Sequence, residues 1–212
     1  MFKHWRRIET PTRAPPLTAV LARAFVARAV ALRQLRFATL IAIGFHGSLR
    51  TGELLALTFK DIEITAQCGV VSLDHSKTGW RTGAKEAIAV RDRLTLQLLD
   101  VLLSLQHQPG DKVWPHSAQK FRSDFARMCE FFQVSSLHMK PYSLRRGGAT
   151  FLLQSGGALE AILVRGRWRS LAVARLYLED GMAQLPSLRL KPDALRLVDR
   201  WASETPPTAF QP

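Results

Sequence analysis

Residues 47–57 read Gly-Ser-Leu-Arg-Thr-Gly-Glu-Leu-Leu-Ala-Leu and place an arginine between two helical segments. The apolar run 37–46 before this stretch has helical spacing, and a glycine follows it as a stop signal. A short second helix is predicted to begin just after Arg50 and to end near Leu57. Glu53 lies three residues after Arg50, close enough to brace its guanidinium. Because a free charge is costly in a partly apolar segment, we interpret Arg50 as a binding group for an anion, with a structural ion pair as the alternative.

A second arginine pair lies far along the chain. Arg145 and Arg146 stand near the start of a helix predicted over residues 144–154, and helix N-termini favour anions. From His138 to Tyr177 the chain has seven Lys and Arg residues and one acidic residue. With Tyr177 on a basic helix, this set suits a phosphate clamp beside a phenol. For any one of these arginines alone, a solvated face or a structural ion pair is the favoured interpretation, and only the set as a whole favours the clamp.

The composition of the whole chain points to the same kind of partner. Its 212 residues suit one domain with tails, and 30 Lys and Arg against 17 Asp and Glu give a net charge of +13. The excess is mostly arginine and is spread over both halves. Such a surface attracts polyanions, so nucleic acid is the leading partner and an anionic membrane the second. No apolar run is long enough to cross a bilayer.

The cysteines exclude a disulfide scaffold. Cys68 and Cys129 are isolated, and neither has Cys or His neighbours at the spacing of a zinc site. We therefore expect a reducing compartment, no metal and no cofactor.

The periodicity predicts an α+β domain that is mainly helical, with a small antiparallel three-stranded sheet. Residues 1–16 hold three prolines and little periodicity, and we interpret residues 1–15 as an arm or linker. The domain is expected over 16–185 and a C-terminal tail over 186–212, where Pro186 and Pro192 interrupt the pattern. The expected strands are 62–65, 70–73 and 86–90, and the expected helices are 18–35, 37–46, 51–57, 94–105, 119–132, 144–154, 159–165 and 171–178.

Four blocks occur in a fixed order. The first-arginine block is 49–57, followed by Asp61-Ile62; the lysine block is Ser76-Lys77-Thr78-Gly79; the second-arginine block is Tyr142-Ser143-Leu144-Arg145; and the tryptophan block is Gly166-Arg167-Trp168, with Tyr177 nine residues after Trp168. Together, over about 16–180, they resemble the catalytic domain of the tyrosine recombinase (phage integrase) family.

The resemblance implies a site-specific recombinase or integrase that breaks and rejoins DNA strands. Tyr177 would attack a phosphodiester to form a 3′-phosphotyrosyl link and release a 5′-hydroxyl, which splits one hard step into two. Arg50 and Arg145 would hold the non-bridging oxygens. Lys77 would protonate the leaving oxygen, and Trp168 would donate its indole N–H or pack the site.

The remaining assignments follow from the same resemblance. The expected partners are double-stranded DNA and further copies of the chain on DNA, in an intracellular, DNA-associated setting without a membrane. Tyr142 completes the expected catalytic set, with Glu53 and His138 in support. The residues expected to contact DNA from the surface are Arg146, Arg167, Arg169, Arg175 and Trp80.

Two features depart from the family pattern. Tyr142 stands where the family usually has a histidine, and a phenol with an ordinary pKa near 10 is a poor base at neutral pH. His138 is a candidate to compensate, and a surface loop histidine is the alternative. Family members also usually carry a helical core-binding domain before this one, which the 15 residues before Pro16 are too few to form.

Two other functions remain open at this point. One is a catalytically inactive DNA-binding relic of a mobile element, which the Tyr142 departure favours and the intact arginines and Tyr177 disfavour. The other is a type IB topoisomerase-like nicking and closing enzyme, which would use the same chemistry without paired sites.

Overall fold

The computed structural model of the chain describes residues 14–73, 86–175, 184 and 189–204. These residues form a mainly helical domain with a small sheet, as the periodicity predicts. The helices are α2 (Ala19–Ala31), α3 (Leu35–His46), α4 (Thr51–Ala56), α6 (Arg93–Ser104), α7 (Ala118–Phe131), α8 (Tyr142–Gln154), α9 (Leu159–Gly166), α10 (Leu171–Ala174) and α13 (Pro192–Ser203), with 3-10 turns η1 (Phe59–Asp61) and η2 (Ser135–Leu137).

The sheet contains β1 (Ile62–Ile64), β2 (Gly69–Leu73) and β3 (Glu86–Val90), in that spatial order. Both pairings are antiparallel, and Val71 pairs with Ile62 on one side and Ile88 on the other. Paired residues on neighbouring strands point to the same face of a sheet, and these three side chains are all buried. The sheet therefore contributes one apolar face to the core.

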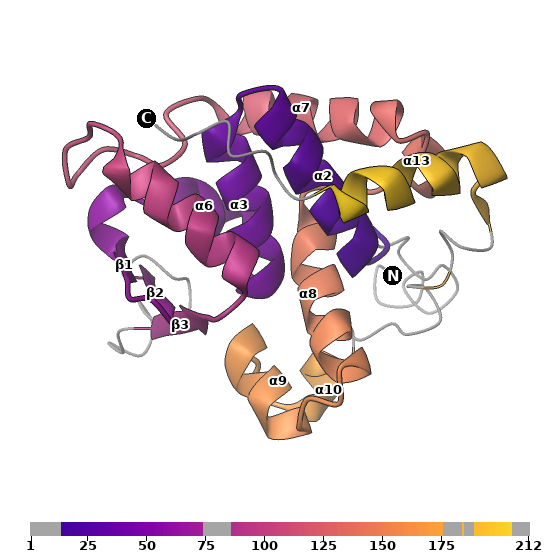
Figure 1. The fold of residues 1–212 in the computed structure, drawn as a ribbon. Coiled ribbons are helices and arrows are strands. Elements are labelled where there is room, and N and C mark those ends of the chain that lie inside the picture. Colours follow the sequence, from indigo (N-terminus) through magenta and orange to yellow (C-terminus); the bar gives the residue numbers. More distant parts are fainter. Residues whose placement is uncertain (1–13, 74–85, 176–183, 185–188, 205–212) are drawn as a thin grey trace, which may run out of the picture.

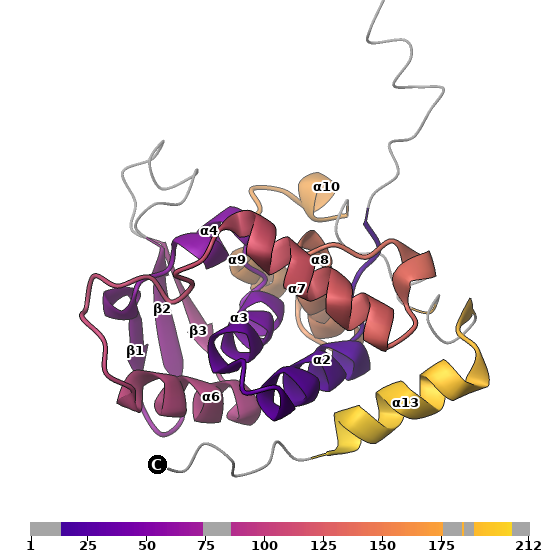
Figure 2. The same cartoon turned by 90° about the horizontal axis from the view of Figure 1, so that it is seen from above.

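Helix α3 lies at the centre of the domain. It is apolar on all sides, and every residue from Phe37 to Phe45 is buried, which is the pattern of a helix surrounded by other elements. Helix α2 is capped by Thr18, whose hydroxyl oxygen accepts from the Leu21 amide at 3.2 Å. Seen from above, α6 and α13 lie on one face, α4, α9 and α10 lie on the opposite face, and α3 lies between them (Figure 2).

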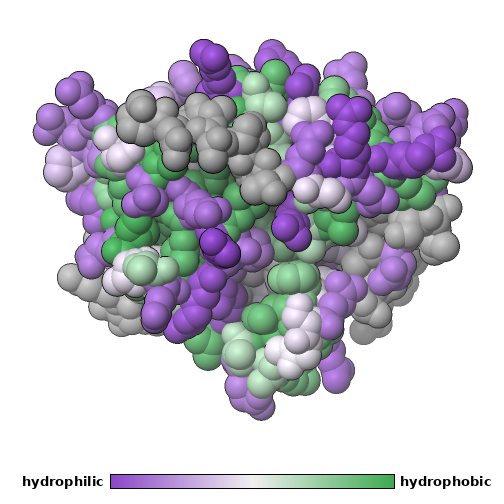
Figure 3. All heavy atoms as spheres, in the orientation of Figure 1, coloured by the Kyte–Doolittle hydropathy of each residue, from purple (hydrophilic) through white to green (hydrophobic). Residues whose placement is uncertain are grey.

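Helix α8 connects the central helices to a smaller lobe formed by α9 and α10 (Figure 1). A separate cluster of buried side chains, Ala149, Ile162, Trp168 and Ala174, holds this lobe together. Hydrophobic residues also reach its surface (Figure 3), including Val164, which is 76% exposed. The lobe is thus joined to the main core through α8 and the polar contacts described below.

The stretch expected as a C-terminal tail contains helix α13, which packs on α2. Pro192 is its first residue, a position that tolerates proline because the missing N–H has no partner there in any helix. The Arg28 guanidinium lies over the rings of Phe131 and Trp201, 4.3 Å and 5.3 Å from their centroids. This stack fixes α13 against α2 and α7.

Among the described residues, none of the helices is both long enough and apolar enough to traverse a bilayer. Both cysteines are free thiols.

Candidate active site

The Arg145 side chain connects three parts of the chain. It is buried, with 0% exposure, and its Nη1 donates to the Ser48 carbonyl at 2.5 Å while Nη2 donates to the Gly166 carbonyl at 2.6 Å. Its guanidinium carbon lies 5.0 Å from the ring centroid of Trp168. The second-arginine block therefore contacts the tryptophan block directly, and it contacts the main chain two residues before Arg50.

Two glycines allow α8 to come close enough for these contacts. A Cβ on Gly147 would lie 2.0 Å from the Leu17 carbonyl oxygen, and one on Gly148 would lie 1.8 Å from the Phe45 carbonyl oxygen. Both distances are impossible for real atoms, so the backbone of α8 packs on the backbones of α3 and of the residues before α2. This approach brings Arg145, one turn earlier on α8, within reach of Ser48.

Arg50 and Glu53 form an ion pair at the start of α4. The Arg50 Nη1 donates to Glu53 Oε1 at 2.5 Å, and the Arg50 amide donates to Glu53 Oε2 at 2.9 Å. The Glu53 side chain is 6% exposed and that of Arg50 is 32% exposed. Glu53 is thus fixed in the interior, and it holds a partly accessible guanidinium.

Arg167 does not occupy the surface position expected of a DNA contact. Its side chain is 7% exposed, and its Nη2 donates to Glu53 Oε2 at 2.5 Å while its Nε lies 3.3 Å from Glu86 Oε2. Burial lowers its pKa from the usual value, and the charge of Glu53 opposes that shift. Spacing along the chain could not predict this role, because Glu53 and Glu86 are both distant from Arg167 in sequence and only the fold brings them together.

Arg146 is also buried, with 1% exposure, so its expected place on the helix surface is wrong. Its Nη1 donates to the Ala14 carbonyl at 2.6 Å. The reason is the close packing of α8, in which all residues from Ser143 to Thr150 are buried. Arg146 therefore ties the beginning of the domain to α8.

The other predicted residues lie at the surface or outside the described part of the chain. Tyr142 is the first residue of α8 and is 37% exposed. His138 is exposed in the turn before α8, with a left-handed φ of 52°. Arg169 and Arg175 are exposed on the α9–α10 lobe. Lys77, Trp80 and Tyr177 lie outside the described residues; residues 74–85 connect β2 to β3, and Tyr177 comes three residues after the end of α10.

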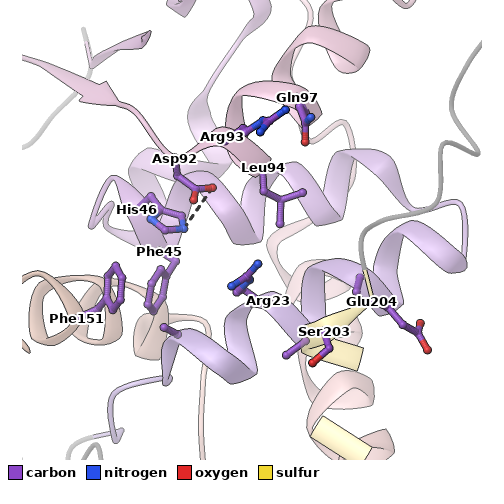
Figure 4. A pocket seen from close by; sticks show the side chains of 13 residues that line it. Arg23, Phe45, His46, Asp92, Arg93, Leu94, Gln97, Phe151, Ser203 and Glu204 are labelled. Atoms are coloured by element: carbon purple, nitrogen blue, oxygen red, sulfur yellow. Dashed lines mark ion pairs between the residues drawn. The ribbon is translucent and has the colours of Figure 1, made fainter. Parts of the chain in front are cut away.

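A pocket of about 510 Å³ is lined by residues of α2, α3, α6, α8 and α13 and contains none of the predicted catalytic residues (Figure 4). Within it, His46 Nε2 lies 3.5 Å from Asp92 Oδ1, and Arg23 points toward the same space from α2. Burial lowers the pKa of His46, more than the neighbouring Asp92 raises it. His46 is therefore held mainly as the neutral imidazole at neutral pH.

No group of three or more His, Cys, Asp or Glu side chains in the described part of the chain is placed to hold a metal ion. The polar centre of the candidate site is built from arginines, two glutamates and a tryptophan, and arginines of this kind suit a phosphate more than a cation.

Three solved structures of DNA recombination proteins share this fold. The XerH site-specific recombinase, solved bound to its difH substrate, matches with a TM-score of 0.60 and 18% identity over 85% of this chain and 55% of that one. The XerA recombinase matches with a TM-score of 0.55 and 18% identity over 93% of this chain and 66% of that one. The Tn1549 transposon integrase, solved with circular intermediate DNA, matches with a TM-score of 0.59 and 16% identity over 89% of this chain and 65% of that one.

The chain thus spans between about half and two thirds of the length of these recombinases. Their identities are low, so they establish the shared fold. No match is found among curated proteins. The phage integrase family itself matches residues 22–183, a range that includes Arg50, Arg145, Trp168 and Tyr177. With the four blocks in order and this match over most of its length, the chain belongs to the phage integrase family.

Proposed function

We propose that the chain is the catalytic domain of a DNA strand-transferring tyrosine recombinase. The observation that carries the proposal is the position of Arg145, whose buried guanidinium bonds to the Ser48 and Gly166 carbonyls and stacks on Trp168. Blocks that are far apart in sequence are thereby joined around one guanidinium. Packing alone requires no such arrangement, because apolar side chains would fill the same space without buried charge.

In this proposal Arg50 and Arg145 bind the non-bridging oxygens of the scissile phosphate. Arg50 is partly accessible, whereas Arg145 is buried and must first give up one of its bonds to the Ser48 and Gly166 carbonyls. Glu53 accepts one bond from the Arg50 amide and one from its guanidinium. The second bond restricts the guanidinium in advance, so it loses less freedom when it binds the phosphate. Preorganised donors of this kind are most effective where negative charge develops in the transition state.

Tyr177 supplies the nucleophile and Lys77 the proton for the leaving group. The phenol loses its proton to solvent as its oxygen forms a bond to phosphorus. The bond from phosphorus to the 5′ oxygen breaks, and that oxygen takes a proton from Lys77. The phosphotyrosyl bond conserves the energy of the phosphodiester, so a second strand can be joined without ATP. These two roles rest on the order and spacing of the blocks.

Duplex DNA is the proposed partner. The net charge of +13 and the exposed Arg169 and Arg175 on the α9–α10 lobe favour contact with phosphates. Binding is then expected to weaken steeply with salt, by about 0.9 log unit in affinity per decade of salt for each phosphate neutralised.

The test is covalent trapping on a library of nicked suicide duplexes, with Tyr177→Phe as the matched variant. The proposal predicts a denaturation-resistant adduct for the parent, and none for the variant although it still binds DNA. Binding by the parent without any adduct would favour the inactive relic. Relaxation of supercoiled plasmid at no defined site would favour the topoisomerase-like activity.

A further inference from the structure

We infer that Arg167 is a positioning residue for Arg50, acting through a buried ion-pair network that joins α4, β3 and the tryptophan block. The inference rests on the proposed function, because it concerns how Arg50 is presented to a phosphate. It replaces the expected role of Arg167 as a surface contact to DNA.

The network is defined by three contacts. Glu53 Oε2 accepts from Arg167 Nη2 at 2.5 Å, and Glu53 Oε1 accepts from Arg50 Nη1 at 2.5 Å. On its other side, Arg167 Nε lies 3.3 Å from Glu86 Oε2 without the alignment of a hydrogen bond. The contact with Glu86 is therefore electrostatic, and Glu53 is the stronger partner of Arg167.

The network joins elements that carry different parts of the proposed site. Glu53 belongs to α4, where Arg50 is the cap, and Arg167 lies next to Trp168. Glu86 is the first residue of β3, where the connection that carries Lys77 ends. A planar guanidinium can face carboxylates on two sides with different N–H groups, which the compact ammonium of a lysine cannot do in the same fixed geometry.

The backbone of Arg167 also indicates that its side chain is needed. Its φ is 53°, in the left-handed region that glycine adopts without steric cost and other residues rarely occupy. An arginine at this position therefore bears a backbone cost that a glycine would not. The contacts with Glu53 and Glu86 supply a reason for that.

Charge balance explains how Arg167 would affect Arg50. Arg50 and Arg167 are matched by Glu53 and Glu86, so the four side chains together are neutral. Without the Arg167 charge, the network would carry a net charge of −1 next to the phosphate site. Glu53 would then hold Arg50 more strongly, and both carboxylates would repel the phosphate.

The experiment compares Arg167→Gln with the double variant Arg167→Gln/Glu86→Gln, in which neutrality is restored. Single-turnover cleavage is measured on a nicked duplex with a normal scissile phosphate and on one with a neutral methylphosphonate at that position. Arg28→Gln is the control, because Arg28 makes structural contacts with Phe131 and Trp201 away from the four blocks. Urea unfolding of every variant reports stability separately.

We expect Arg167→Gln to slow cleavage of the normal duplex at least about ten-fold with little change in DNA binding. This is a smaller loss than the roughly 10²–10³-fold for removal of one preorganised donor, because Arg167 acts through Arg50. The double variant should recover most of the rate. The methylphosphonate duplex should show a much smaller difference between Arg167→Gln and the parent, since the neutral group is not repelled.

Three results would overturn the inference. One is a parental cleavage rate for Arg167→Gln. Another is a loss that is equal on both duplexes and persists in the double variant, which would indicate a structural role alone. If the parent itself forms no adduct, the proposed function is wrong and this inference is overturned with it; the first two results leave the proposed function intact.

Discussion

Replacing Gly148 by alanine should strongly destabilise the domain. The new Cβ would lie 1.8 Å from the Phe45 carbonyl oxygen, 2.9 Å from its carbon and 3.0 Å from the Ser48 hydroxyl oxygen. The nearest obstacle is backbone, so no change of rotamer relieves the clash. Helices α8 and α3 must separate by about 1.2 Å before the contact reaches even the shortest distances seen between real atoms.

The cost follows from that separation. Overpacking of a core costs roughly 1–3 kcal/mol. A shift of this size would also stretch the 2.5 Å bond from Arg145 to the Ser48 carbonyl beyond hydrogen-bond range, and a bond from a charged donor contributes about 1.5–3 kcal/mol. Alanine regains up to about 1 kcal/mol of helix propensity. We therefore expect a net loss of about 3 kcal/mol.

The assay is urea unfolding followed by circular dichroism, with Gly52→Ala as the control. Gly52 lies in α4, and a Cβ there would meet no atom within 4 Å, so this variant should be as stable as the parent or more stable by up to about 1 kcal/mol. The reasoning is refuted if Gly148→Ala unfolds within about 0.5 kcal/mol of the parent, the range of ordinary surface substitutions.

Three further predictions concern the site and its surroundings. Arg50→Ala should reduce cleavage by about 10²–10³-fold while DNA binding changes little, because many other cations share the binding; a folded variant with parental cleavage would exclude Arg50 from the site. Tyr142→His should raise cleavage near pH 7 if the reaction needs an acceptor with a pKa near 6.5, and an unchanged or lower rate contradicts that need. Since burial places the pKa of His46 below its unfolded value of 6.5, the unfolded chain binds more protons there, and stability should fall as the pH drops below 6.5, by at most about 1.4 kcal/mol per pH unit. His46→Gln should remove that part of the slope in urea unfolding, and equal slopes would count against it.

Local patterns were sufficient to predict most of the fold. The apolar run 37–46 became α3, and the strands lie within a residue or two of their expected ranges, because burial of one face imposes a period on the sequence. Helix α13 was not predicted. Pro192 was interpreted as a break, although at the first position of a helix it costs nothing.

The candidate site was predictable only in part. Contacts within one block, such as the pair of Arg50 and Glu53, follow from spacing along a helix. The burial of Arg146 and Arg167 depends on which elements pack against them, and the Glu86 partner comes from a strand 81 residues earlier. Charge pattern alone cannot distinguish a buried ion pair from a surface contact, so both were assigned to DNA.

The proposed chemistry requires that Tyr177 become covalently joined to DNA. The most direct measurement is mass spectrometry of the peptides released from an adduct trapped on a nicked suicide duplex. We expect a nucleotide on Tyr177 and no adduct from Tyr177→Phe. A nucleotide on Tyr142 instead, or no adduct on any duplex to which the protein binds, would contradict it.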